Sequence, residues 1–416
     1  MNAPAESASP FSLATFRRWA FFRLASTLGG QVQLLALGWY VYGLTGQPMA
    51  LAYVGLAQFL PVISLVLVTG HVADRFDRRA ILSACSLAQA ACALIFLVLA
   101  RGGGRHLGAA YALCVMLGVA RAFWGPASQS LVPSLVPAAA LPRALAFSAS
   151  LWQFATIAGP ALGGLLLAAP TGLPGGFAVA AALALCAAAL AATLKPRSPL
   201  PKAGTASWKT LLAGVRYVRE QPLLLACVSL DLFAVLLGGA TALLPVYARD
   251  VLHVGAPGLG LLRAAPSAGA LAMALWLAFR PLGGRAGLKM LGSVFAFGLL
   301  TVAFGVSKNV YVSLVALGLL GAADMVSVVV RQTLVQVRTP DAMRGRVSAV
   351  NQVFVGASNE LGEFESGATA ALLGAVPAVV IGGLGTCFVV ACWAFFFPEL
   401  RRVDRLDRPE PPKAVA

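Results

Sequence analysis

Hydrophobic and polar positions alternate along this chain in long blocks, and an apolar run recurs about every 30 to 35 residues. Each run is long enough for the ~20-residue helix that crosses a bilayer core. The runs show no period-two alternation, so membrane-spanning strands are not expected. The pattern predicts an all-α integral membrane protein with twelve transmembrane helices, centred near Leu34, Pro61, Ala91, Val115, Thr156, Leu183, Leu236, Ala270, Ala296, Leu320, Ala357 and Cys387.

The composition excludes an ordinary soluble protein. Charged residues make up 11% of the chain, against roughly 25% in globular domains. The first residues are polar and Arg23 interrupts the apolar run that follows, so we expect no cleaved leader. The seven cysteines fall within predicted helices without a CxxC pair, which favours small core residues over a disulfide or metal framework. No metal or cofactor is therefore expected.

The formal net charge of +16 raises the question of a nucleic-acid partner. Most of the 31 Lys and Arg residues fall in loops that are cytoplasmic if the N-terminus is inside, as the positive-inside rule describes. The basic charge therefore reflects membrane topology, and we expect contact with a lipid bilayer and no nucleic acid. The richness in Ala and Arg is typical of a high-GC bacterium. We accordingly predict a multi-pass protein of the bacterial inner membrane with both termini in the cytoplasm.

The chain contains an internal repeat. Residues Ser128–Gly164 align without gaps on Arg331–Gly367, with Gly159 on Gly362 and Gly164 on Gly367. The repeat predicts two six-helix bundles of the same fold. Between them lies a segment rich in Pro and basic residues, which is typical of a linker. The predicted division is 1–194 for the first bundle, 195–220 for a cytoplasmic linker, 221–397 for the second bundle and 398–416 for a cytoplasmic tail.

A basic decapeptide, Gly70–Arg79, separates the second and third apolar runs. An Asp after a small-residue helix end, followed by several Arg, is suited to a short cytoplasmic connection whose charges contact neighbouring helix ends. We predict that Asp74 holds Arg78 or a nearby helix terminus during gating. The candidate gating residues of this loop are Gly70, Asp74, Arg75, Arg78 and Arg79.

The fifth predicted helix contains the sequence Gly159-Pro160-Ala-Leu-Gly163-Gly164. Pro160 removes one helix hydrogen bond, and the three glycines permit close approach of another backbone. We predict a bendable gating element here, with ordinary small-residue packing as the alternative. The matching element of the second half, Gly362–Gly367, has no proline, so only the first half would supply the hinge.

These motifs resemble the major facilitator superfamily along almost the whole chain. The loop is similar to the family pattern G-x-L-a-D-R-x-G-R-R/K, with Val72 for Leu and Asp77 for the usual Gly. The Gly159–Gly164 element resembles the GPxxGG motif of the family's drug/proton antiporters. Arg121 with Gly125 resembles an R-x-x-q-G motif assigned to proton transfer, although Trp occupies the Gln position.

Two stretches, residues 121–127 and 344–400, also resemble the branch that contains enterobactin and macrolide exporters. The resemblance implies a substrate held near the membrane midplane between two halves that rock around it. It also implies that predicted helices one, four, seven and ten line the central cavity.

Charged residues inside the apolar runs cost about 2.5 to 3.5 kcal/mol each at a helix centre, so we expect partners or a function. Arg121 aligns with Asp324 in the repeat, and Arg23 and Asp231 occupy positions one helical turn apart when the two halves are superposed. We predict that the first half presents two cations to a substrate cavity and the second half two anions. For Arg23 the alternative is a side chain that extends to the interface. Arg331 is expected to reach the cytoplasmic interface.

Three carboxylates lie in the eleventh predicted helix. At 100° per residue, Glu360 and Glu363 lie about 60° apart, whereas Glu365 lies on another face. Desolvation and like charge both favour protonation of such a pair. We predict that Glu360 and Glu363 carry the coupling proton, with Asp324 and Asp231 as alternative carriers and a static network with Arg263 or helix dipoles as the alternative role.

Motifs of metalloproteases, serine hydrolases and P-loop NTPases are absent from the sequence, so we predict a transporter and no enzyme. The predicted function is proton-coupled efflux of small organic or amphiphilic molecules, of the drug or siderophore type, by a functional monomer. Its partners are a small-molecule substrate, protons and lipid. The alternatives are uptake or facilitated diffusion of a polar solute, a non-transporting membrane scaffold, and an integral-membrane enzyme.

Overall fold

The computed structural model describes residues 13–103, 106–137, 140–195, 208–280 and 282–405. Throughout these ranges the chain forms helices and no strand, as the hydropathy pattern predicts. The α-helices are α1 (Ala14–Thr45), α2 (Pro48–Ser64), α3 (Val66–Arg75), α4 (Arg78–Gly102), α5 (Leu107–Leu135), α6 (Leu141–Ala168), α7 (Gly172–Ala192), α8 (Trp208–Glu220), α9 (Pro222–Leu237), α10 (Leu244–Val246), α11 (Gly255–Phe279), α12 (Ala286–Val306), α13 (Val310–Arg338), α14 (Asp341–Leu373), α15 (Ala375–Phe396) and α16 (Pro398–Arg402). A 3-10 turn, Ala240–Leu243, precedes α10, and a π-helix, Tyr247–Val251, follows it.

Nine helical segments of the described chain are long and apolar enough to cross a membrane. The other three predicted transmembrane segments correspond to α1, to α2 with α3, and to α14. Composition and length explain the difference: α1 contains two glutamines and four glycines in its uncharged part, α14 contains several charged residues, and α2 has 17 residues. The protein is therefore a multi-pass membrane protein, and the count of twelve stays a prediction.

The chain divides into two compact units. The first comprises Met1–Ala206 with Pro245–Ala264, and the second comprises Ser207–Leu244 with Ala265–Ala416. The division differs from the one predicted from the sequence because residues 245–264 group with the first unit. Close contacts explain this grouping. The Tyr42 hydroxyl donates to the Asp250 carboxylate, and a Cβ atom on Gly164 would lie 2.9 Å from the Gly260 Cα.

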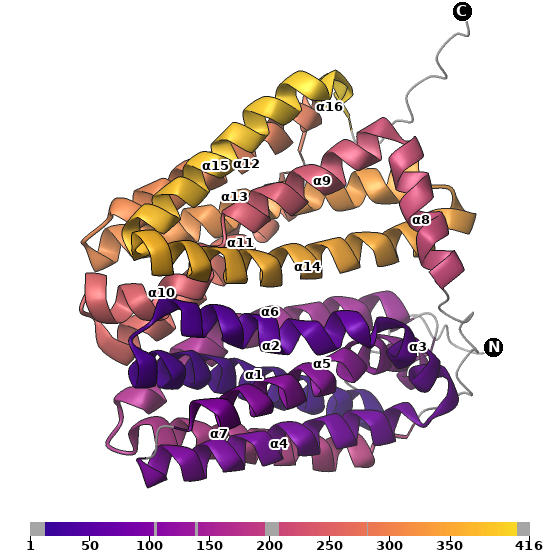
Figure 1. Ribbon diagram of the computed structural model, residues 1–416. Coiled ribbons are helices and arrows are strands. Elements are labelled where there is room, and N and C mark those ends of the chain that lie inside the picture. Colours follow the sequence, from indigo (N-terminus) through magenta and orange to yellow (C-terminus); the bar gives the residue numbers. More distant parts are fainter. Residues whose placement is uncertain (1–12, 104–105, 138–139, 196–207, 281, 406–416) are drawn as a thin grey trace, which may run out of the picture. The chain divides into compact units, whose positions relative to one another are not determined.

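In the first unit, α1 packs against both α6 and α7, α4 packs against α7 and α5, and α2 packs against α5 (Figure 1). Small residues allow these close approaches: α7 is rich in Ala and Gly, and a Cβ atom on Gly29 of α1 would lie 3.1 Å from the Leu183 Cβ. Large buried side chains, including Phe16, Trp19 and Leu131, fill one core of this unit. The packing fixes α1 between its neighbours.

In the second unit, α12 packs against α13 and α15, and α9 packs against α14 and α15. Glycines again set the spacing. A Cβ atom on Gly298 of α12 would lie 2.8 Å from the Gly383 carbonyl oxygen of α15, and one on Gly362 of α14 would lie 2.8 Å from the Val235 oxygen of α9. Gly159, the repeat partner of Gly362, joins α6 to α1 in the same way, since its Cβ atom would lie 2.5 Å from that of Gln31.

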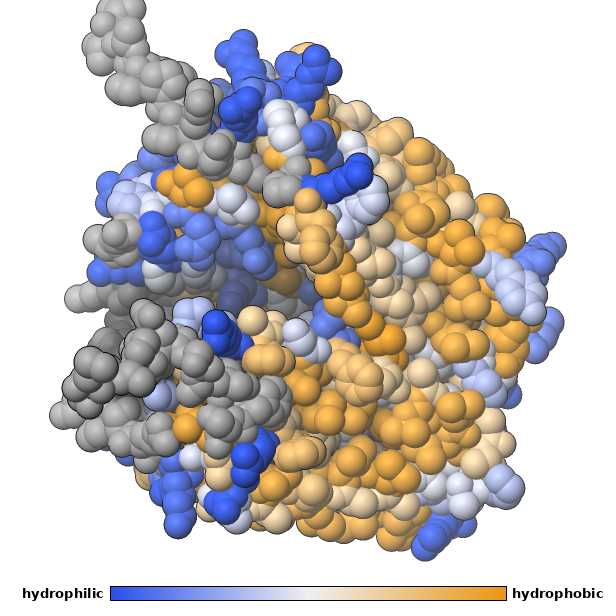
Figure 2. Space-filling model, turned by 180° about the vertical axis from the view of Figure 1, so that it is seen from behind, coloured by the Kyte–Doolittle hydropathy of each residue, from blue (hydrophilic) through white to orange (hydrophobic). Residues whose placement is uncertain are grey.

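Hydrophobic side chains gather over the flanks of the helices on the face drawn in Figure 2, and hydrophilic residues gather toward the borders of that view. Several large apolar residues are strongly exposed, among them Phe279 at 85% and Phe395 at 76%. A soluble protein rarely exposes such a surface. The exposed residues are suited to contact with lipid acyl chains.

Candidate functional site

A polar pocket of about 310 Å³ lies within the first unit. It is lined by residues of α1, α2, α4, α5 and α6, including four glutamines, two tryptophans and a single charged side chain among the described residues. The lining residues are Ser26, Thr27, Gly30, Gln31, Gln33, Leu34, Leu37, Gln58, Cys85, Gln89, Leu117, Ala120, Arg121, Trp124 and Trp152.

Glycines position the walls of this pocket. Gly159 allows α6 to cover the stem of Gln31, and Gly118 allows α5 to pack directly against the backbone of Gln58. Gly30 leaves room for Gln89, whose Nε2 would lie 3.5 Å from a Cβ atom there. The GPxxGG element predicted from the sequence does not itself line the pocket, but Gly159 packs against Gln31, which does.

Arg23 lies beside the pocket without being part of its lining. Its Nη1 donates to the Ser128 Oγ at 3.0 Å, and its guanidinium lies 4.7 Å from the centre of the Trp124 ring. Both partners belong to α5, so Arg23 links α1 to α5 and holds one face of Trp124. The structure thus places the Arg23 side chain between two helices, and the sequence left this open. Arg121 lies in the pocket wall.

The second unit contains a buried ion pair. The Arg331 Nη1 lies 2.5 Å from the Asp231 Oδ2, and both side chains are at most 5% exposed. Arg331 also donates to the Asn351 Oδ1 at 3.5 Å. The expectation that Arg331 reaches the cytoplasmic interface is therefore wrong, because Asp231 on α9 holds it inside the unit. Asp231 correspondingly does not present a lone anion to a cavity.

A second carboxylate lies next to this pair. Asp324 of α13 and Asp231 both line a small cavity of about 10 Å³ together with Ser327, which is 1% exposed. The Ser327 Oγ has no hydrogen-bond partner in the described part of the chain. A space of this size holds about one water molecule. The prediction that Arg121 and Asp324 both face a substrate cavity stays a prediction.

The three carboxylates of α14 are all partly buried. Glu365 accepts a hydrogen bond from the Thr369 Oγ1 at 2.9 Å, one turn further along the helix. Glu360 and Glu363 lie on a different face of α14, as helical geometry requires. Their predicted role as proton carriers stays a prediction.

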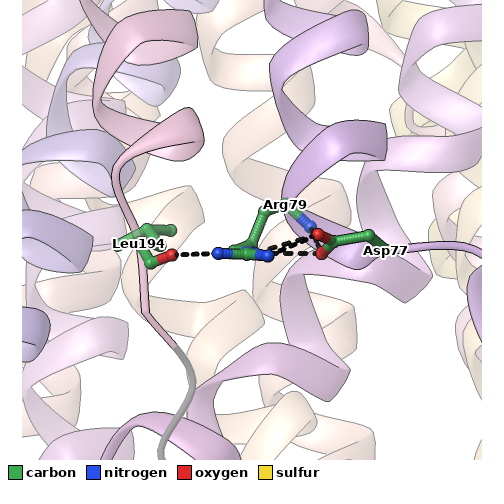
Figure 3. A network of polar contacts seen from close by, with 3 residues as sticks. All are labelled: Asp77, Arg79 and Leu194. Carbon is green, nitrogen blue, oxygen red and sulfur yellow. Dashed lines mark hydrogen bonds and ion pairs between the residues drawn. The ribbon is translucent and has the colours of Figure 1, made fainter.

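In the Gly70–Arg79 segment, which comprises the end of α3 and the beginning of α4, two arginines contact backbone carbonyls of other elements. Arg78 is buried and its Nη1 donates to the Ser130 oxygen at 3.0 Å. Arg79 donates to the Leu194 oxygen at 2.8 Å and pairs with Asp77 at 2.7 Å (Figure 3). Asp77 also accepts from the Arg79 backbone N–H and so caps α4. The Asp77–Arg79 hydrogen bonds hold the pKa of the Asp77 carboxyl below its usual value.

The remaining loop residues differ from these two arginines. Gly70 and Arg75 lie in α3, where the Arg75 side chain is exposed. The side chain of Asp74 lies outside the described residues, so its predicted contact with Arg78 stays a prediction. Asp77, which departs from the family pattern, forms the N-cap of α4. An Asp directly before a helix is a common N-cap, so the sequence alone could have predicted this role.

The gating element of α6 packs against α11. A Cβ atom on Gly260 would lie 2.6 Å from the Pro160 oxygen and 3.0 Å from the Gly164 Cα. Gly163 faces α1 instead, with Leu35 Cδ2 at 3.4 Å from its Cβ position. The two ends of the motif therefore contact different helices, and the Gly164–Gly260 approach depends on the absence of a side chain on both residues.

The glutamines of the pocket were not identified from the sequence. Gln33, Gln58 and Gln89 each fall within an apolar run, and a polar side chain inside the membrane is expected to have a function. A glutamine gives a weaker signal than a charged residue, because burying an uncharged amide in the membrane costs less free energy than burying a charge. Helix periodicity does not show which glutamines from different helices converge on one pocket.

Comparison with known proteins agrees with this architecture. The family described as transmembrane secretion effector matches residues 5–413. The enterobactin exporter EntS of Shigella boydii serotype 4 (strain Sb227) is 27% identical over 393 residues, which cover 93% of this chain and 89% of that protein. EntS of Escherichia coli O139:H28 (strain E24377A / ETEC) is 28% identical over 84% of this chain and 83% of its own.

Solved transporters share the fold at low sequence identity. The crystal structure of a bacterial homologue of the human lysosomal transporter Spinster, in an inward-facing and occupied conformation, superposes with a TM-score of 0.76 at 11% identity. The match covers 97% of this chain and all of that one. At this identity the likeness concerns the fold alone.

Proposed function

Since the chain belongs to the transmembrane secretion effector family of the major facilitator superfamily, we propose that it is a proton-coupled exporter of small organic or amphiphilic molecules. It would work by alternating access in the bacterial inner membrane, as a monomer with both termini in the cytoplasm. The EntS relatives support export. The polar pocket of the first unit supports a small-molecule substrate, since it combines aromatic surfaces with hydrogen-bonding groups.

The observation that carries the coupling proposal is the charge balance of the second unit. Asp231, Asp324 and Arg331 form a cluster with one negative charge in excess, inside two predominantly apolar helices. An unbalanced charge is costly in such surroundings, and one bound proton removes it. Arg331 already neutralises Asp231, so Asp324 is the carboxylate of this cluster best suited to exchange that proton.

Glu360 and Glu363 are the second candidate carriers. They lie about 60° apart on α14, which packs against α9, the helix that contains Asp231. Protonation would remove like charge at this pair too. Gly362 lies between them and contacts α9, so a change in this region would be transmitted to the helix that bears the ion pair.

Proteoliposomes test the proposal. Purified protein is reconstituted with a pH-sensitive dye, and efflux of enterobactin and of a set of aromatic dyes is measured with and without a proton gradient. We expect gradient-driven efflux accompanied by proton flux in the wild type. Accumulation that is indifferent to the proton gradient would contradict antiport and favour facilitated diffusion.

Three variants separate the candidate carriers. Asp324→Asn, and the double change Glu360→Gln with Glu363→Gln, are each compared with Glu365→Gln, which alters a carboxylate bonded to Thr369. A variant that lacks the proton carrier should lose gradient-driven efflux and retain counterflow. Counterflow needs the conformational cycle but no net change of protonation. Full gradient-driven efflux in both test variants would rule out both sites.

A further inference from the structure

An open groove lies on the surface of the second unit, between α13 and the part of α11 that belongs to this unit, residues 265–279. Its volume is about 410 Å³, and the described residues of its wall are all apolar. They occur at the spacing i, i+3, i+4, i+7 on each helix, so each helix contributes one continuous stripe of a single face. The stripes are Gly269, Ala272, Met273 and Trp276 of α11 and Val315, Gly318, Leu319 and Ala322 of α13.

Small residues form the floor of this groove. A Cβ atom on Gly269 would overlap the Gly318 oxygen, so α11 and α13 meet there backbone against backbone. The Cβ position of Gly318 is open, since its nearest neighbour is the Ala265 oxygen at 3.8 Å. Trp276 and Val315, by contrast, are large and remain 57% and 61% exposed. The groove is therefore a recess between larger side chains.

The repeat shows that this floor is particular to the second half of the chain. At the offset that aligns Arg121 with Asp324, Gly318 corresponds to Val115 and Leu319 to Met116. Valine has a branched side chain at the position where glycine has none, so it would occupy the recess. The groove thus depends on the local sequence of α13 and is not required by the repeated fold.

A hydrocarbon chain is the ligand suited to such a wall. The described residues of the wall carry no charge, and the Trp276 indole N–H is their side-chain donor. Both α11 and α13 are long and apolar enough to cross a membrane, so the exposed groove faces lipid. An unfilled recess would deprive its lining atoms of dispersion contacts, which an acyl chain restores.

The stripe on α11 leads to a cation. Arg280 lies one helical turn beyond Trp276, and its backbone N–H donates to the Trp276 oxygen at 2.8 Å, so the helical face continues to Arg280. The guanidinium lies 5.2 Å from the centre of the Trp276 ring, and the Arg280 side chain is exposed. The ion pairs that join described residues involve other arginines. Arg280 is therefore placed to hold an anion beside the groove.

The distance from this cation to the floor of the groove matches one leaflet of a bilayer. Gly269 and Arg280 are about three helical turns apart, or roughly 16 Å along the axis. Half of the hydrocarbon core of a bilayer is about 15 Å thick. A lipid whose phosphate lies at Arg280 would therefore extend its acyl chain along the groove to the contact between Gly269 and Gly318. Tryptophan at the end of a spanning helix is typical of the membrane interface.

We infer that this groove binds an acidic phospholipid, with one acyl chain between α11 and α13, the Trp276 ring beside the start of that chain and the phosphate group on Arg280. The lipid is a bound ligand of the protein and not its transported substrate, so the inference goes beyond the proposed function and does not depend on which solute is exported. A bound lipid would stabilise the second unit, because it binds the folded unit and not the unfolded chain.

Native mass spectrometry of the purified full-length protein in detergent tests this inference. The protein is incubated with phosphatidylglycerol or with phosphatidylcholine of the same acyl chains, and the bound lipid molecules are counted. We expect the first phosphatidylglycerol to bind about fivefold more tightly than phosphatidylcholine, because Arg280 attracts a headgroup with a net negative charge. Equal affinities for the two lipids would overturn the inference.

Two pairs of variants assign the contacts. Arg280→Gln should remove the preference for phosphatidylglycerol, whereas Arg401→Gln, which replaces an exposed arginine of α16, should retain it. Gly318→Leu should weaken the binding of both lipids about tenfold, because the leucine fills the floor of the groove. Gly292→Leu is its matched control, since Gly292 is exposed on α12 with open space around its Cβ position. A preference that persists in Arg280→Gln, or an unchanged affinity in Gly318→Leu, would contradict the proposed site.

Fluorescence gives a second readout, which needs no substitution in the floor of the groove. Brominated acyl chains quench a tryptophan that they contact, and the protein contains seven tryptophans. In reconstituted vesicles, brominated phosphatidylglycerol should quench the wild type more than brominated phosphatidylcholine does, and Trp276→Phe should lose this excess. Trp152→Phe, which replaces an exposed tryptophan of α6 in the first unit, should keep it. An excess that survives in Trp276→Phe would place the lipid elsewhere and overturn the inference.

Discussion

In each unit a charged side chain joins two equivalent helices by a hydrogen bond, but the helix that supplies the arginine differs between the units. In the first unit Arg23 on α1 donates to Ser128 on α5. In the second, Asp231 on α9 accepts from Arg331 on α13, and Arg331 is the residue that the repeat aligns with Ser128. The cation therefore comes from the first helix in one unit and from the fourth in the other. The helix contact has been retained between the halves, while the chemistry that forms it has changed.

A second pair of equivalent hydrogen bonds shows the same exchange of the charged group between the two units. In the first unit the beginning of α4 is bound to the segment after α7 through Arg79 and the Leu194 oxygen. In the second unit the beginning of α12 is bound to the segment after α16, but there the Arg285 backbone N–H donates to the Asp404 carboxylate at 2.7 Å. A side-chain cation and a backbone acceptor in one unit thus correspond to a side-chain anion and a backbone donor in the other.

The interiors of the two units therefore differ in charge and in empty space. The ion pair of the second unit is neutral and closely bonded, and the cavity beside it has room for about one water molecule. In the first unit the partner of Arg23 is the neutral Ser128, and no carboxylate of the described residues forms an ion pair with it; a pocket of about 310 Å³ lies alongside. Under the proposed function, the first unit would bind the substrate and the second would exchange the proton.

The largest expected effect tests the ion pair. Arg331→Leu leaves Asp231 buried without its cation, so the free energy of unfolding should fall by about 3–5 kcal/mol. Chemical denaturation in detergent measures this change. Replacing both residues by Leu should restore most of the loss, because a well-packed apolar pair avoids the desolvation of two ions. Stability of Arg331→Leu equal to that of the wild type would mean that the pair contributes nothing to holding α9 and α13 together.

The next effect tests the repeated glycine contact. Gly159→Ala and Gly362→Ala each force a methyl group toward a neighbouring helix, so each should destabilise its unit by about 1–3 kcal/mol. Gly125→Ala and Gly356→Ala are matched controls in open space, and they should be neutral or stabilising because alanine favours a helix. The melting temperatures of the four variants decide the matter. Destabilisation of the controls as well would point to a general intolerance of substitution.

A smaller effect is expected at Arg23. Arg23→Met removes one charge-assisted hydrogen bond and a cation–π contact while keeping an apolar stem, so we expect a loss of about 1–2 kcal/mol. This is less than the loss for Arg331→Leu because no carboxylate is left unpaired. Arg101→Met, at the exposed end of α4, is the control. A loss as large as that of Arg331→Leu would show that the Arg23–Ser128 and Arg331–Asp231 interactions stabilise their units equally, against the expectation.

The smallest effect concerns pH at the α4 cap. Arg79 lowers the pKa of the Asp77 carboxyl, so the stabilisation is present above the unfolded pKa and is lost as the pH falls through the folded pKa. Both side chains are more than a third exposed, at 46% for Asp77 and 34% for Arg79, which limits the effect to about 1 kcal/mol or less.

Asp77→Asn keeps a capping oxygen and removes the charge, so it isolates the electrostatic part of this tie. The melting temperature of the variant should lie slightly below that of the wild type near pH 7, and the difference should close in acid. A difference that persists below the folded pKa of Asp77 would have to come from packing or capping, because the Asp77 carboxyl is then neutral in both the folded and the unfolded chain.

The amino-acid sequence by itself determined the membrane environment, the helical class, the internal repeat and the family resemblance. These follow from local or periodic properties: apolar runs of bilayer length, the uneven distribution of Lys and Arg, and matching residues at corresponding positions. The sequence also identified Arg23, Arg121, Asp231 and Asp324 as unusual, because a charge within an apolar run is costly wherever it faces.

Only the tertiary structure decided which of these residues meet. Asp231 and Arg331 are 100 positions apart, and the pocket of the first unit combines side chains from five helices. Such convergence depends on how far each helix is rotated about its axis and how closely it approaches its neighbours. Glycines such as Gly118 and Gly159 set that approach. Helical periodicity gives the face of a residue but not the partner opposite it, so the glutamine-lined pocket emerged only from the packing of whole helices.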